Sequence, residues 1–379
     1  MKWSRFVFVF VFLFVGAVAL GQSPGPVKNV VIYDEPGRFA GWPANNGIWS
    51  WGDEIVVGFT LGYYKEKPSG HPIDPDRPSQ PRLARSLDGG ETWTIESPSF
   101  LDAGGKQGDP MPCPGDIDFT QPNFAFWVRM QGSNQGFSYF YWSNDRCKTW
   151  QGPYQLPKFE RTGVFSRTDY IVKGPNDLMA FMTAAKASGG EGWPFCAQTT
   201  DGGKTWKHVS WIGKEPGPGG YAIMPSTVRL SDSELFTYIR CRGVKEGGEK
   251  WWWIEPYRSL DNGQSWQLEK ENSIDNAGNP AHMIKLKDGS LALTYGYRHA
   301  PYGVRARISS DRGKTWTGDI ILRDDGGEWD LGYPRAAQRA DGKIVTAYYF
   351  NDTKHKERYI AATIWDPGAV EKPSLGGSQ

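Results

Sequence analysis

The octapeptide TTDGGKTW at Thr199–Trp206 is one copy of the pattern that decides the fold of this 379-residue chain. Every copy has Ser or Thr first, Asp third and Trp eighth, and the others are SLDGGETW (Ser86–Trp93), SNDRCKTW (Ser143–Trp150), SLDNGQSW (Ser259–Trp266) and SSDRGKTW (Ser309–Trp316). The copies begin at residues 86, 143, 199, 259 and 309, so 57, 56, 60 and 50 residues separate them. A repeat of this length predicts one four-stranded sheet per copy.

Each copy has the composition of a tight hairpin turn. The Asp carboxylate can accept backbone N–H bonds within the turn, Gly tolerates a positive φ, and Trp can cover the base of the hairpin. We therefore expect the five repeated aspartates to be structural and not catalytic: Asp88, Asp145, Asp201, Asp261 and Asp311.

A second pattern lies between the turns, in which a short strand, a polar turn and a very apolar strand follow one another. DYIVKGPNDLMAF (169–181) and HMIKLKDGSLALTY (282–295) are examples, and the pattern is looser at 123–141. These segments predict the first and second strands of successive blades, and the repeated turn then joins the third strand to the fourth.

The two ends of the chain predict how the ring closes. The last unit ends in RYIAATIW (358–365) without a repeated turn after it, while KNVVIYD (28–34) is an unpaired strand before the first blade. If the N-terminal strand completes the last blade, no sheet edge is left open. The sequence therefore predicts an all-β fold, a single six-bladed β-propeller over residues 22–379.

Composition excludes several classes of protein. Lys plus Arg (43) and Asp plus Glu (42) nearly cancel, so a nucleic-acid partner is not expected. The 47 Gly, 27 Pro and 18 Trp indicate many turns and broad side chains, which argues against a helical bundle. The five histidines show no zinc-site spacing, and no glycine loop for nucleotides is present, so we expect no cofactor and no metal.

The first residues are typical of an export signal. Lys2 and Arg5 precede an apolar stretch at 6–20, and Ala19-Leu20-Gly21 supplies small residues at the two positions that a signal peptidase recognises. We expect a signal peptide over 1–21, a secreted or periplasmic protein, no membrane span after cleavage, and a monomer. An even number of cysteines permits disulfides after export, and their pairing stays open: Cys113, Cys147, Cys196 and Cys241.

A six-bladed propeller with this turn resembles the sialidase (neuraminidase) superfamily, where the turn is called the Asp box. The resemblance covers nearly all of the chain after the leader and implies an exo-acting glycoside hydrolase for acidic glycans. It places a carboxylate-binding arginine on Arg240 in VRLSDSELFTYIR and a nucleophilic tyrosine on Tyr333 in GYPRAAQRADG. It also implies a general acid in GHPIDPDRPSQ, which offers Asp74 and Asp76 with His71 beside them.

The sequence also departs from that superfamily. The glutamate that would activate the tyrosine corresponds to Met224, the third arginine falls near Pro301, and GWPANNGIW stands in place of the N-terminal F/Y-R-I-P motif.

The residues themselves predict a polar site on the ring axis. Aligned starts of the inner strands place five polar residues at equivalent positions: Asn46, Asp169, Ser226, His282 and Arg335. A polar ring of this kind suits a ligand funnel. Several arginines around one axis, including Arg242 and Arg298, favour a carboxylate ligand because guanidinium binds it with two parallel bonds. Some of these arginines can instead pair with Asp330, Glu255 or Glu357 to hold loops.

Three functions remain open. In glycoside hydrolysis, Tyr333 acts as nucleophile and Asp74 or Asp76 as acid. In β-elimination at a uronate, arginines neutralise the carboxylate while His282, His71 or Tyr333 removes the proton, and Met224 in place of the glutamate favours this reaction. In a non-catalytic glycan-binding propeller, aromatic side chains such as Trp42 bind sugar without an acid and a base on the axis.

Overall fold

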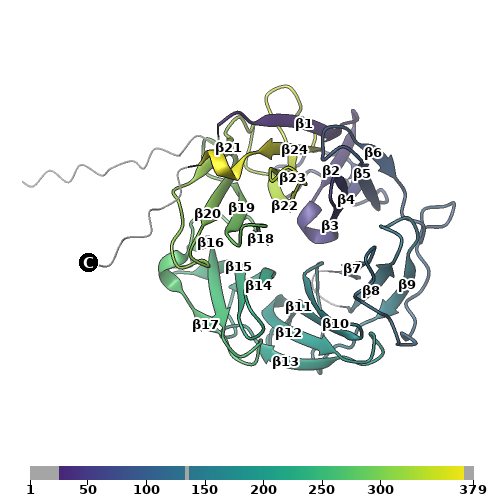
Figure 1. Ribbon diagram of the computed structural model, residues 1–379. Coiled ribbons are helices and arrows are strands. Elements are labelled where there is room, and N and C mark those ends of the chain that lie inside the picture. Colours follow the sequence, from purple (N-terminus) through teal and green to yellow (C-terminus); the bar gives the residue numbers. More distant parts are fainter. Residues whose placement is uncertain (1–24, 133–135, 371–379) are drawn as a thin grey trace, which may run out of the picture.

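The computed structural model describes residues 25–132 and 136–370, and these form six small antiparallel sheets arranged in a ring (Figure 1). The predicted six-bladed β-propeller is confirmed. The predicted signal peptide, at 1–21, lies outside the described residues. In the described part of the chain, no helix is long and apolar enough to cross a membrane.

Blade one has an unusual inner edge. Its sheet order is β2-β4-β5-β6, and β3 also pairs with β4, so two short segments share the innermost position with the helix α1 (Pro43–Asn46) between them. The strands are β2 (Arg38–Gly41), β3 (Gly47–Trp51), β4 (Glu54–Tyr63), β5 (Gln80–Ser86) and β6 (Thr94–Glu96).

Blade two has three strands, β7 (Ala125–Met130), β8 (Ser138–Ser143) and β9 (Gln151–Gln155). Its Asp box joins β8 to β9, the position that the third and fourth strands occupy in the other blades. The inner strand is therefore the one that this blade lacks among the described residues, which explains the looser sequence pattern at 123–141.

Blades three to five each have four strands in sequential order. Blade three contains β10 (Tyr170–Gly174), β11 (Asp177–Ala185), β12 (Glu191–Thr199) and β13 (Lys207–Trp211). Blade four contains β14 (Tyr221–Arg229), β15 (Leu235–Val244), β16 (Lys250–Ser259) and β17 (Gln267–Leu268), followed by η1 (Lys270–Asn272). Blade five contains β18 (Ala281–Lys285), β19 (Leu291–Tyr297), β20 (Gly303–Ser309) and β21 (Ile320–Arg323).

Blade six closes the ring as the sequence predicts. Its sheet order is β1-β24-β23-β22, with β1 antiparallel to β24 and Lys28 opposite Ile364; the purple and yellow strands lie side by side in Figure 1. The strands are β22 (Gly332–Gln338), β23 (Ile344–Phe350), β24 (Tyr359–Trp365) and β1 (Lys28–Tyr33), and η2 (Pro367–Ala369) follows β24.

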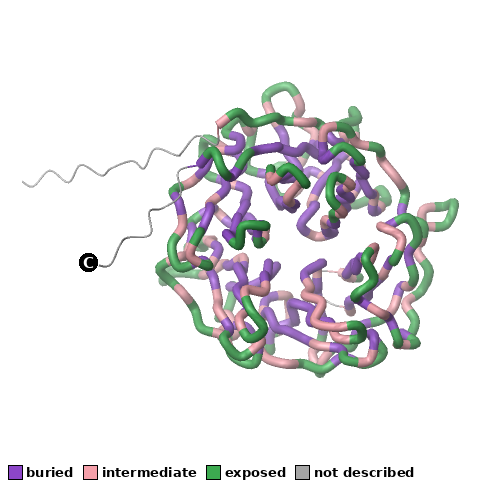
Figure 2. Tube along the Cα trace, viewed as in Figure 1, coloured by how far each residue is buried: buried purple, intermediate pink, exposed green. Residues whose placement is uncertain are grey.

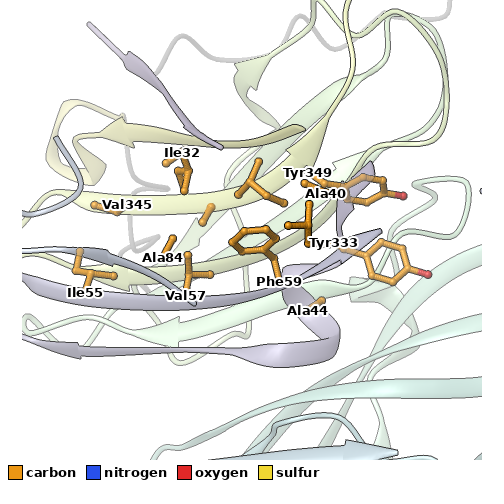
Figure 3. Packing of buried hydrophobic residues seen from close by; sticks show 14 of the residues in the cluster. Ile32, Ala40, Ala44, Ile55, Val57, Phe59, Ala84, Tyr333, Val345 and Tyr349 are labelled. Atoms are coloured by element: carbon orange, nitrogen blue, oxygen red, sulfur yellow. The ribbon is translucent and has the colours of Figure 1, made fainter. Parts of the chain in front are cut away.

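The core lies between neighbouring blades. Both faces of each sheet are covered, so the central strands are largely buried, and all seven residues of β23 and of β24 are buried. Figure 2 shows buried residues running through the blades, with many exposed ones on the outer turns. Figure 3 shows the cluster between blades six and one, where Tyr333 and Tyr349 lie at one end with their hydroxyl groups directed away from the aliphatic side chains.

The Asp boxes are hairpin turns with the predicted hydrogen bonds. In the first, Asp88 accepts bonds from the Thr92 N–H (2.9 Å) and the Ser86 hydroxyl (2.8 Å), and Trp93 Nε1 donates to the Gly90 carbonyl (2.9 Å). The Thr92 hydroxyl also donates to Asp88, at 2.5 Å, and this bond is the largest influence on the carboxylate. Together with the bonds from the Thr92 N–H and the Ser86 hydroxyl it lowers the pKa of Asp88 to about 2, although burial opposes this. The same Asp-to-Ser/Thr bonds recur in the other four boxes.

Candidate functional site

The site is built on two matching irregularities at the entrances of inner strands. Tyr333 on β22 and Met224 on β14 both have positive φ, 49° and 56°, and each lies where the register with the next strand shifts. A proline follows each of them and cannot donate to the ladder, which favours a bulge. A bulge changes the direction of a side chain. Tyr333 thereby directs its hydroxyl toward the arginine on β15.

Arg240 and Tyr333 form the first half of the site. Arg240 Nη1 donates to the Tyr333 hydroxyl oxygen at 2.6 Å, and the guanidinium lies 5.4 Å from the centre of the Tyr221 ring. Burial lowers the pKa of Arg240, but the oxygens of Tyr333 and Tyr221 outweigh this and raise it, so the group is cationic. Its Nε is buried without a hydrogen-bond partner, and no carboxylate of the described residues forms an ion pair with it. An anionic ligand would supply the missing acceptor.

His71 and Asp330 form the second half. The two residues come from a loop of blade one and from the approach to β22, and His71 Nδ1 lies 2.6 Å from Asp330 Oδ1. Burial raises the pKa of Asp330, but the His71 hydrogen bond and the charges of Arg298 and Arg358 bring it down to about 2. The carboxylate is therefore ionised and His71 Nδ1–H donates, which leaves Nε2 for a substrate.

Asp330 is fixed from several sides. Tyr349 donates its hydroxyl to Oδ1 at 2.5 Å, and Arg358 Nε donates to Oδ2 at 3.1 Å. Arg298 lies 3.7 Å from Oδ1 and uses its other donors on Tyr349 and on the Leu331 carbonyl. The predicted pairing of arginines with Asp330 is thus observed for Arg298 and Arg358. These two arginines hold the loop that carries Asp330.

Aromatic rings surround the imidazole of His71. Their centres lie 5.0 Å away for Trp42, 6.1 Å for Trp329 and 6.3 Å for Tyr333. The side chain of His71 is 33% exposed, so it can be reached from outside. Trp42 was a sequence candidate for sugar stacking, whereas Trp329 and Tyr221 were missed because no repeated pattern marks them.

Asp74 and Asp76 lie further along the loop of His71. Lys65 Nζ pairs with both, at 3.2 Å and 2.9 Å, and the Asp76 side chain is 77% exposed. The structure gives neither residue a contact with Tyr333 or His71. Both remain predictions as general acids, and His71 occupies the better place for that role.

The predicted polar ring fastens neighbouring blades together. Asp169 accepts from the Thr227 N–H (3.2 Å), Ser226 from the Met283 N–H (2.9 Å), and His282 Nδ1 from the Ala336 N–H (2.9 Å). Each acceptor therefore binds the inner strand of the following blade. The hydrogen-bonding capacity of the ring is largely used within the fold.

Arg335 and Asn46 belong to the same central layer. Arg335 is buried, and its Nη2 donates to the carbonyl oxygens of Ala44 (2.7 Å) and Thr168 (2.6 Å) across the axis. Burial lowers the pKa of Arg335 to about 10. Asn46 is buried as well and donates to the Trp42 carbonyl at 3.1 Å, which fixes the short helix beside the site.

Arg242 lies outside this layer, on the rim. Its Nε donates to the Gly219 carbonyl at 2.8 Å, and its guanidinium lies 4.5 Å from the centre of the Tyr221 ring. Among the described residues, no group of three or more His, Cys, Asp or Glu side chains is arranged to hold a metal. The four cysteines are buried free thiols.

Comparison with known proteins identifies the family. A model described as a BNR repeat-like domain matches residues 119–346, which is more than half of the chain, and the chain belongs to this family. The resemblance to the sialidase superfamily of Asp-box propellers is thereby confirmed. No curated protein sequence matches.

Several solved structures with the same architecture are distant from this chain in sequence. An alpha-L-arabinofuranosidase from Fusarium graminearum is 13% identical with a TM-score of 0.61, covering 90% of this chain and 98% of its own. The NanB sialidase from Streptococcus pneumoniae is 12% identical (TM-score 0.59; 90% and 71%). An alpha-L-arabinanase from Penicillium chrysogenum is also 12% identical (TM-score 0.59; 89% and 97%). These three proteins are glycoside hydrolases that share the propeller fold.

Proposed function

We propose that this protein is an exported glycoside hydrolase that removes a carboxylate-bearing sugar from the end of a glycan. The observation that carries the proposal is that a tyrosine hydroxyl bound by a buried arginine lies beside a histidine held by a buried carboxylate. The centres of the His71 and Tyr333 rings are 6.3 Å apart, so one sugar can contact both. The glycosidases that share the fold support the same class of reaction.

The first chemical step uses Tyr333 as nucleophile. Arg240 donates to the Tyr333 oxygen, and a cationic donor at this position stabilises the negative charge that the oxygen carries as nucleophile. The phenolate oxygen attacks the anomeric carbon while His71 Nε2–H gives its proton to the departing glycosidic oxygen. Asp330 orients the imidazole through the hydrogen bond at Nδ1.

The second step restores the enzyme. Neutral His71 takes a proton from water, and the resulting hydroxide attacks the anomeric carbon and releases the tyrosine oxygen. The free Nε of Arg240 is the natural contact for the carboxylate of the sugar. Met224 stands beside Arg240, with its sulfur 3.9 Å from Nη1, so the activation of Tyr333 rests on the cation and not on a glutamate.

β-Elimination at a uronate is the second candidate, and one observation favours it. In the described part of the chain, no carboxylate bonds to the Tyr333 hydroxyl, whereas a His, a Tyr and an Arg with a free donor are the groups that this reaction needs. Arg240 would neutralise the carboxylate and acidify the α-proton. His71 would remove that proton, and Tyr333 would protonate the leaving oxygen.

One assay separates the candidates. Sialyl and glucuronate-terminated oligosaccharides are incubated with the protein, and reducing-sugar release is followed together with absorbance at about 235 nm, where the unsaturated uronate formed by elimination absorbs. Release without absorbance supports hydrolysis, and absorbance supports elimination. Tyr333→Phe should abolish either signal, while Tyr302→Phe, outside the site, should not. Binding without turnover would overturn both reactions in favour of a glycan-binding propeller.

A further inference from the structure

A groove lies between blades three and four. Its volume is about 680 Å³, within the range of small-molecule sites. One wall is the loop 213–220, the floor comes from the end of β15, and the other wall is the aromatic face of β16. Tyr221 and Arg242 line it at the end nearest the candidate site.

The aromatic wall is a flat, preformed surface. Trp251 and Trp253 alternate with Trp252 along β16, so they share one face of the strand, and their rings stack with centres 4.5 Å apart at 12°. The Trp251 ring lies across Gly243 on the neighbouring strand, where an added Cβ would come within 1.9 Å of it. Trp251 nevertheless remains 40% exposed. A ring that is held in place but accessible is suited to stack on a ligand.

The polar groups of the groove are also fixed. Glu255 accepts from Trp253 Nε1 at 2.7 Å and from the Tyr257 hydroxyl at 2.8 Å, which orients its carboxylate. On the opposite wall, Arg242 Nε donates to the Gly219 carbonyl (2.8 Å), and Lys186, which does not line the groove, holds the Gly220 carbonyl from behind (2.7 Å). A broad aromatic face with a fixed acceptor beside it and a fixed guanidinium near it suits a sugar, which presents C–H groups on one face and hydroxyls at its edge.

The groove adjoins the candidate site at Tyr221. The Tyr221 ring lies 5.4 Å from the guanidinium of Arg240 and 4.5 Å from that of Arg242, so it links the two. We infer that the groove between blades three and four is a second binding site for glycan, in which Trp251 stacks on a sugar two or three residues from the one at Tyr333. This inference rests on the proposed function for the identity of the chain that enters the groove.

The consequence is a preference for oligosaccharides. A para-nitrophenyl glycoside fills only the space at Tyr333, whereas a tetrasaccharide with the same terminal sugar extends over Tyr221 to Trp251. Trp251→Ala should weaken binding of the tetrasaccharide and lower its kcat/KM by about tenfold, the order expected for one aromatic contact, and leave the para-nitrophenyl glycoside unchanged. Trp252→Ala is the matched control, because Trp252 is on the other face of the strand and does not line the groove.

The experiment uses the full chain in two forms. Turnover of both substrates is measured with the active protein, and tetrasaccharide binding by calorimetry with Tyr333→Phe, each with and without Trp251→Ala. Loss confined to the tetrasaccharide supports the groove. If Trp251→Ala affects both substrates equally, or affects neither, the inference about the groove is overturned. Turnover of the substrates still supports the proposed function in that case. Tetrasaccharide binding that depends on Trp251 without any turnover keeps the groove and rejects the proposed function. If neither binding nor turnover is detected, the groove and the proposed function are both rejected.

Discussion

His71 and Asp330 are 259 positions apart in sequence, yet His71 Nδ1 and Asp330 Oδ1 lie 2.6 Å from each other. The ring brings them together, because blade six and blade one are neighbours once β1 has paired with β24. The pair gives the site a histidine with a defined tautomer: Nδ1 carries the proton that faces the carboxylate, and Nε2 is left for a substrate.

Asp330→Asn should lower kcat by roughly a hundredfold or more, because the imidazole loses both its orientation and its stabilising charge. Steady-state rates from pH 4 to 9 test this. Asp324→Asn, at an exposed position before the same loop, is the control, and an unchanged rate for Asp330→Asn would remove His71 from the mechanism.

The same carboxylate should contribute acid-sensitive stability. The pKa of Asp330 is about 2 in the folded protein and 3.8 ordinarily, so its contribution is present above about pH 4 and is lost as the pH falls toward 2. The shift corresponds to about 2 kcal/mol of unfolding free energy. The free energy of unfolding can be measured with denaturant for the wild-type protein and for Asp330→Asn. The difference between the two proteins should be larger at pH 7 than at pH 3. An equal difference at both values would contradict this.

Asp169 should change the stability of the fold with pH in the opposite direction to Asp330. Burial is the largest influence and raises the pKa of Asp169 to about 7, although the charge of Arg335 opposes it. A folded pKa above the ordinary 3.8 means that stability is full below about pH 4 and falls as the pH rises through 7, by roughly 4 kcal/mol at most. Asp169→Asn should flatten the melting temperature between pH 5 and 8, whereas the exposed control Asp232→Asn should follow the wild-type curve. A wild-type curve that rises through this range would refute the assignment.

Arg335→Ala should destabilise the ring by roughly 3 kcal/mol, because the carbonyls of Ala44 and Thr168 lose their donor in a buried layer and a cavity forms. Its effect on turnover should follow the loss of folded protein. Thermal unfolding and activity per folded molecule separate the two effects. Full stability with lost activity would instead make Arg335 a ligand contact, as the sequence predicts.

Asp201→Ala should lower stability by about 1–3 kcal/mol and leave kcat/KM unchanged. Asp201 accepts from the Thr205 N–H (2.9 Å) and the Thr199 hydroxyl (2.9 Å) within its own turn, which contains no residue of the candidate site. Urea unfolding and steady-state kinetics test both parts. A selective loss of activity would show that an Asp box reaches the site.

The architecture was predictable because each repeated turn is stabilised by hydrogen bonds within its own eight residues. Five turns and one unpaired N-terminal strand determine the number of blades and the way in which they close. Two irregular features were not predictable, namely the helix Pro43–Asn46 and a blade two in which the described residues form no inner strand. Each replaces a repeated element with an irregular one that long-range contacts stabilise.

The site was predictable in part. Tyr333, Arg240 and His71 were predicted as site residues, the first two through the family resemblance. The structure places the three side chains next to one another, and their roles stay predictions. Asp330 was expected only as a partner for arginines. Its contact with His71 was missed because no sequence pattern links the two segments that carry these residues. The ring residues Asp169, Ser226 and His282 have a polar character that suits a ligand, but hydrogen bonding between blades requires it equally.

The pairing of β1 with β24 also determines how the ring would respond to force. Lys28 begins β1 and lies opposite Ile364, next to the last residue of β24, so the two ends of the described chain leave the sheet at the same side. Tension between those ends would load the interstrand hydrogen bonds one pair at a time and not all at once. Strand β1 would separate from β24 one residue pair after another, from Lys28 toward Tyr33. Blade six would therefore be the first blade to unfold.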